Sequence, residues 1–136
     1  MTASDFQTLL NVADVEKSID FYALFGFAVV QNYADEEGVP QWCQLKSGEA
    51  IFMLNRQDRI DAVERHNRPD FGDAVHYISV PDADDMHRRL AAHGIAAPPP
   101  EPQMYGVLEF RLRDPDGYEI AVGSRISDEQ AASDAL

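Results

Sequence analysis

Apolar and polar residues alternate along several short stretches of this chain, and alternation with period two is typical of half-buried strands. In the first half it predicts strands at about 6–12, 28–33, 41–46 and 50–55. In the second half it predicts strands at about 74–80, 108–113 and 118–123. A short strand is also expected near 95–97, whereas the proline-rich segment APPPEP (97–102) is expected to be a loop.

Two longer stretches repeat their apolar residues at a period near 3.6 and predict helices. The first begins after Asp14 and ends near Gly26, and the second begins after Pro81-Asp82 and ends near Gly94. Aspartate is a favoured N-terminal cap, and glycine commonly ends a helix. Strands and helices thus share the chain, which predicts an α+β fold.

The order of elements in the first half recurs in the second. Val12 and Val80 each lie 14 residues before the glycine that ends the following helix. SGEAIFML also parallels DGYEIAVG, which matches Gly48 with Gly117 and Ile51 with Ile120. A βαβββ unit is therefore predicted twice. We expect a single domain over 1–136, with module one at about 5–56, a charged linker at about 57–71 holding a helical turn, module two at about 72–126 and a polar tail at 127–136.

Three segments in this order resemble the vicinal oxygen chelate superfamily, which includes glyoxalase I, bleomycin resistance proteins and extradiol dioxygenases. They are NVADVEKSIDFYALFGFAVV, WCQLKSGEAIFML and LEFRLRDPDGYEIAV. The chain is most similar in character to bleomycin-resistance-like members. The resemblance implies a cupped, partly open mixed barrel built from the two βαβββ modules. It also implies a ligand in the cup, often beside a divalent metal, and a homodimer.

In that superfamily the metal ligands are His, Gln or Glu on the first and last strands of each module. The resemblance places those four positions on Gln7, Phe52, Val75 and Ala121. One polar group among four does not hold a divalent metal, so we expect no cofactor. The alternative is an enzyme of the lyase or dioxygenase type. It would bind Fe, Mn, Ni or Zn through Gln7, Glu119 and a His76 that a β-bulge turns inward. His66, His87 and His93 are expected to be exposed and unconnected.

Strand alternation predicts which side chains face the cup. The expected ligand-binding residues are Gln7, Leu9, Trp42, Gln44, Phe52, Tyr77, Glu109, Arg111 and Glu119. Leu54 is expected on the same face as Phe52, and Met53 beneath a helix. Aromatic side chains stack on flat or cationic ligands, and the two glutamates could pair with a basic group. The alternative is that the aromatic side chains simply fill the core.

The net charge of −13 and a sequence pI of about 4.4 disfavour nucleic acid and anionic membranes as partners. They are compatible with a cationic ligand or with a high-salt environment. No run approaches the roughly 18 apolar residues of a membrane span, and the N-terminus does not resemble a signal peptide, so a cytoplasmic protein is expected. The single cysteine, Cys43, excludes an intrachain disulfide.

Three functions remain open from the sequence. The first is a metal-free binding protein that sequesters a small cationic or aromatic molecule. The second is the metal-dependent enzyme described above. The third is a small acidic dimer whose cup is filled by its own side chains.

Overall fold

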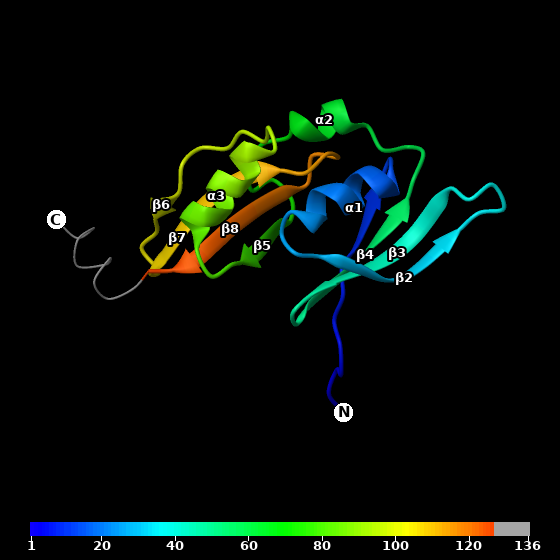
Figure 1. The fold of residues 1–136 in the computed structure, drawn as a ribbon, viewed down its shortest axis with the longest axis horizontal. Coiled ribbons are helices and arrows are strands. Elements are labelled where there is room, and N and C mark those ends of the chain that lie inside the picture. The colour runs from blue at the N-terminus through cyan, green and yellow to red at the C-terminus, as the bar shows by residue number, and fades with distance from the viewer. Residues whose placement is uncertain (127–136) are drawn as a thin grey trace. The chain divides into compact units, whose positions relative to one another are not determined.

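The computed structural model describes residues 1–126, and its elements follow the order β-α-β-β-β twice (Figure 1). The first repeat comprises β1 (Leu9–Val12), α1 (Val15–Ala23), β2 (Ala28–Ala34), β3 (Pro40–Ser47) and β4 (Ala50–Arg56). The second comprises β5 (Val75–Ser79), α3 (Ala83–Ala92), β6 (Glu101–Pro102), β7 (Val107–Arg113) and β8 (Glu119–Arg125). A short helix, α2 (Ala62–His66), lies between them and supplies the helical turn expected in the linker. The α+β class and the repeated βαβββ unit are confirmed.

The chain divides into two compact units, Met1–Asn67 and the part from Arg68 onward. Each unit holds one mixed four-stranded sheet, in the orders β1-β4-β3-β2 and β5-β8-β7-β6. In each sheet the first and last strands of the repeat pair in parallel and the other pairs are antiparallel. Over residues 1–126 neither sheet closes on itself into a barrel. The expected polar tail, 127–136, lies outside the described residues, and the expected single domain stays a prediction.

Each sheet has a helix across one face, α1 in the first unit and α3 in the second (Figure 1). We call the opposite face of each sheet its open face. Both helices begin as predicted, because the side chain of Asp14 accepts from the backbone N–H of Lys17 and that of Asp82 from the N–H of Asp85. None of the helices in residues 1–126 is long and apolar enough to cross a membrane.

The side chains of β4 face the opposite way from the prediction. Leu54 is fully buried and is aligned with the buried Leu10 of β1 and Cys43 of β3, beneath α1. Phe52 shares that face: its ring centroid lies 4.9 Å from that of Tyr22, which belongs to α1. The prediction that Phe52 and Leu54 face the cup is therefore wrong.

Met53, expected beneath the helix, instead lies on the open face with its strand partners Leu9 and Gln44. The cause is the length of one turn. Residues 47–50 separate the partners Lys46 and Ile51, whereas 114–118 separate Arg113 and Glu119, so the second turn is one residue longer. The sequence comparison aligned Gly48 with Gly117, and this alignment placed β4 one residue out of step with β8. A shift of one residue exchanges the two faces of a strand.

The third strand of the second repeat also differs from the prediction. No strand forms at 95–97, where Ile95 donates its N–H to the carbonyl of Leu90 and so helps to end α3. The strand is β6, inside the segment expected to be a loop, and it pairs with β7 at Glu109 and Leu108. β6 is an edge strand. Proline has no N–H to donate, and it is tolerated in an edge strand because one side of that strand has no neighbour to hydrogen-bond.

Candidate functional site

The structure distributes the predicted ligand-binding residues over the two open faces. Leu9, Trp42 and Gln44 lie on the first, with Gln7 beside them just before β1. The second open face carries Tyr77, Glu109, Arg111 and Glu119. Phe52 lies on neither. That these residues bind a ligand stays a prediction.

Amide side chains contact one another on the first open face. Gln44 donates from Nε2 to Oε1 of Gln7 at 2.8 Å, and Gln7 in turn donates to Asp5 at 2.5 Å. Asn55 donates to Oδ1 of Asn11 at 3.1 Å. The oxygen through which Gln7 would bind a metal thus already accepts a hydrogen bond.

A cavity of about 490 Å³ opens on the second open face. Its lining residues come from β5, β7, β8 and the turn before β7, and include Tyr77, Ser79, Tyr105, Val107, Glu109 and Gly123. Two tyrosines and a carboxylate thus surround a space of the size that small-molecule sites have, about 300–1,000 Å³.

Glu109 is the central polar group of this cavity. Only 3% of Glu109 is exposed, and both of its carboxylate oxygens have partners. The Tyr105 hydroxyl donates to Oε1 at 2.7 Å, and the Arg111 guanidinium lies 3.4 Å from Oε2. The hydrogen bond to Glu109 is the largest cause that raises the pKa of Tyr105, to about 12, and Tyr77 adds to the shift. At neutral pH Tyr105 is protonated, as a tyrosine with the ordinary pKa of about 10 would be, and its hydroxyl is the donor to Glu109.

Sequence reasoning missed Tyr105. It stands in the turn between β6 and β7, directly before Gly106, which has a φ of 79°. Gln103 N–H bonds to Val107 carbonyl at 2.8 Å and closes this turn. The tyrosine-glycine pair ahead of a strand was the available signal, but the misplaced third strand hid the hairpin.

A second carboxylate, Glu119, lies at the start of β8 and is 6% exposed. Its Oε2 accepts the backbone N–H of Phe71 at 3.0 Å. The guanidinium carbon of Arg111 lies 3.9 Å from the centre of the Phe71 ring, which is a cation–π contact. Phe71, in the segment predicted as linker, is a second residue that the sequence did not single out.

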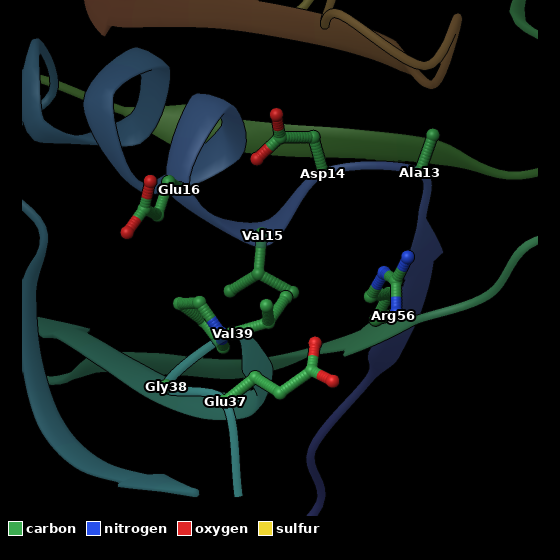
Figure 2. A pocket seen from close by; sticks show the side chains of 9 residues that line it. Ala13, Asp14, Val15, Glu16, Glu37, Gly38, Val39 and Arg56 are labelled. Atoms are coloured by element: carbon green, nitrogen blue, oxygen red, sulfur yellow. The ribbon is translucent and has the colours of Figure 1, made fainter. Parts of the chain in front are cut away.

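The first unit has a smaller cavity, of about 310 Å³, at the beginning of α1 (Figure 2). Figure 2 shows Val15 and Val39 facing each other, with the Glu37 carboxylate on the same side as Arg56. Arg56 already pairs with Asp58 at 3.3 Å. The charged groups of this cavity are exposed carboxylates and one paired arginine, and they assign no ligand.

Two of the residues proposed for a metal in the alternative, His76 and Glu119, lie on opposite faces of the second sheet. His76 is aligned with Ile120, on the face of the second sheet that α3 covers, whereas Glu119 is aligned with Val75 on the open face. The pairing of β5 with β8 is continuous, so no bulge turns His76 inward. No group of three or more His, Cys, Asp or Glu side chains within residues 1–126 is placed to hold a metal. This donor set does not fit a divalent metal.

The remaining histidines and the cysteine lie outside the two cavities, and their exposure differs. His66 and His93 are exposed as expected, but His87 is half-buried: its ring lies 5.2 Å from that of Phe110, and Nε2 contacts the carbonyl of Ala97 at 2.8 Å. The expectation that His87 is exposed is therefore wrong. Cys43 is fully buried, and burial raises the pKa of its thiol, which disfavours a thiolate nucleophile.

The fold is shared with several solved structures. A bleomycin-binding protein in complex with bleomycin superposes with a TM-score of 0.66 at 19% identity, covering 90% of this chain and 99% of the other. TnmS3, an antibiotic-binding protein from Streptomyces sp. CB03234, gives 0.66 at 26% identity, with 92% and 98% covered. A possible glyoxalase from Bacillus cereus gives 0.66 at 18% identity, with 88% and 98% covered.

A comparison with curated protein sequences found no significant match. A family model does match, and it spans residues 6–122, from just before β1 into β8. The resemblance seen in the sequence is thereby confirmed. This chain belongs to the Glyoxalase/Bleomycin resistance protein/Dioxygenase superfamily.

Proposed function

We propose that this protein binds and sequesters a small aromatic or cationic molecule on its second open face, and that it does so without a metal. The observation that carries the proposal is the cavity in which Tyr77 and Tyr105 flank the buried Glu109. The structural similarity to a bleomycin-binding protein and to the antibiotic-binding TnmS3 supports an antibiotic-like ligand.

The chemistry of the cavity suits such a molecule. Tyr77 is 60% exposed, so its ring can stack on a flat ligand without any rearrangement of the core. Glu109 is held in position by Tyr105 and Arg111, so a basic group meets a fixed carboxylate rather than a mobile one. Fixed polar groups reduce the entropy lost on binding.

The metal-free part of the proposal rests on the donor set. With the corrected alignment of β4, the four strand positions that carry metal ligands in the superfamily fall on Gln7, Met53, Val75 and Ala121. Three of these have no group that binds a hard or borderline metal, and Gln7 is hydrogen-bonded to Gln44.

Titration calorimetry with bleomycin tests this proposal directly. We expect saturable binding that weakens about tenfold or more in Tyr77→Ala, because a stacking surface is lost. Val63→Ala is the control, since Val63 is 73% exposed and lies on α2 in the other unit, away from the second open face. Equal weakening in both variants, or no binding at high micromolar concentration, would remove the antibiotic-binding proposal.

We also infer a homodimer. Every residue of β2 is exposed, and β2 is the edge of the first sheet with Val29, Val30 and Tyr33 among its side chains. An exposed edge strand with apolar side chains favours association with another chain. Light scattering should give twice the chain mass, and Val30→Lys should shift the protein to the monomer. A wild-type monomer at micromolar concentration would disprove the dimer.

A further inference from the structure

Glu119 is a buried carboxylate that is only half satisfied. It is 6% exposed, and Oε2 accepts one hydrogen bond, from the Phe71 N–H. Oε1 is buried and has no hydrogen-bond partner in the described part of the chain. Buried polar atoms without partners are rare in folded proteins, and those that persist often belong to a site.

The basic side chains nearest to Glu119 in the sheet are turned to other partners. Arg113 stands directly across from Glu119 in the β7–β8 pair, but its guanidinium donates to the carbonyl of Arg68 and to Asp70. Arg111 contacts the Phe71 ring and Glu109. Over residues 1–126 no ion pair with Glu119 is formed, so its charge is left for a group from outside the chain.

Phe71 covers this carboxylate in a strained conformation. Its φ is 60°, and no other residue except glycine has a positive φ within residues 1–126. A bulky side chain rarely adopts this left-handed region, and such strain gathers at sites that bind or switch. The residue is 57% exposed; its backbone N–H bonds to Glu119 and its ring contacts Arg111.

The segment around Phe71 is fixed at its edges by two ion pairs whose aspartate partners face solvent. Asp70 pairs with Arg113 at 3.0 Å and Asp73 with Arg68 at 3.2 Å, and both aspartate side chains are more than two-thirds exposed, at 73% and 72%. Exposed ion pairs contribute little to stability. Displacing Phe71 would therefore break few strong contacts, and it would free Oε2 of Glu119 beside the unpartnered Oε1.

We propose that Glu119 is the binding site for an organic ammonium group, and that Phe71 is a cap which this group displaces. The inference rests on the proposed small-molecule-binding function and names the chemistry of one group of the ligand. An ammonium supplies the N–H donors and the positive charge that the buried carboxylate lacks. Glu119 lies on the same open face as Tyr77 and Glu109. An aromatic amine bound there can therefore place its ammonium at Glu119 and its ring toward Tyr77.

The probe is benzylammonium, with benzyl alcohol as its uncharged counterpart, titrated while the amide NMR signal of Gly72 is followed. We expect benzylammonium to shift this signal and benzyl alcohol to leave it nearly unchanged. Glu119→Gln should weaken the amine about tenfold or more, since a charged hydrogen bond is lost. Glu16→Gln, an exposed position in the first unit, removes the same charge and should have no effect.

Phe71→Pro gives a second, opposite result. Proline fixes φ near −65° and has no N–H, so the cap cannot form and benzylammonium should bind more tightly than to the wild type. Equal affinity in Glu119→Gln and the wild type would overturn the site, and unchanged affinity in Phe71→Pro would overturn the cap. Bleomycin binding without benzylammonium binding would contradict only this inference, whereas the reverse would contradict only the proposed antibiotic ligand.

Discussion

Asp114 stabilises the turn between β7 and β8 through its side-chain carboxylate. It is 1% exposed, and its Oδ1 accepts from the backbone N–H groups of Asp116 and Tyr118, each at 2.9 Å. Gly117 completes the turn with a φ of 86°. This turn sets where β8 begins, and so it places Glu119 and Ala121 on the open face.

We expect Asp114→Ala to lower the free energy of unfolding by about 1–3 kcal/mol, because one buried and one part-buried N–H group lose their acceptor. Asp114→Asn keeps an oxygen in the same place and should lower it less. Urea denaturation measures both. If the two variants were equally destabilised, the charge of Asp114 rather than its Oδ1 acceptor would hold the turn.

The pKa of Tyr105 reports on Glu109. In Glu109→Gln the pKa of Tyr105, raised to about 12 in the wild type, should fall toward the ordinary value of about 10, since the hydrogen bond to Glu109 is the largest cause of the shift. Tyr77→Phe, which removes a lesser cause, should change it less. NMR of ring-labelled tyrosine resolves the individual titrations, and an unchanged pKa in Glu109→Gln would contradict the contact.

The raised pKa of Tyr105 also makes the stability of the folded protein depend on pH. A folded-state pKa above the unfolded one favours the protonated tyrosine in the folded protein. The resulting stabilisation is present below about pH 10 and is lost as the pH rises toward 12. The wild type should therefore lose more stability across this alkaline range than Glu109→Gln.

At the level of elements, the predicted helices and most strands formed because their signals are local. Asp14 and Asp82 cap their helices as the sequence indicated. The faces of β5, β7 and β8 were also predictable, since alternation along one strand fixes them. The face of β4 was not, because a turn shorter by one residue decides it, and Ile51, Phe52, Met53 and Leu54 are all apolar. The cavity partner Tyr105 depended on β6, whose proline-rich sequence does not predict a strand.

Adjacent substitutions in β4 test its corrected orientation. Leu54→Ala should lower the free energy of unfolding by about 2–5 kcal/mol, because Leu54 is fully buried beneath α1. Met53→Ala, on the open face, should lower it by about 1 kcal/mol or less. Urea denaturation compares the two, and a larger effect at Met53 would mean that the faces are reversed.

At the level of the whole molecule, the net charge of −13 acts on stability. Excess like charge repels itself in the compact state, and salt screens this repulsion. Raising the salt from about 0.01 M to about 0.15 M shortens the Debye length from roughly 30 Å to about 8 Å. The melting temperature should rise by a few degrees, and equally in NaCl and KCl. A melting temperature that fell with salt would show that attractive pairs dominate instead.

We propose that a small molecule binds on the second open face without a metal. Calorimetry with metal-free bleomycin and chelator-treated protein measures this binding. We expect one saturable site whose affinity is the same with and without chelator and falls about tenfold or more in Glu109→Gln, which removes the fixed carboxylate. Binding that appears only after Fe, Mn, Ni or Zn is restored, or that is unaffected by Glu109→Gln, would contradict it.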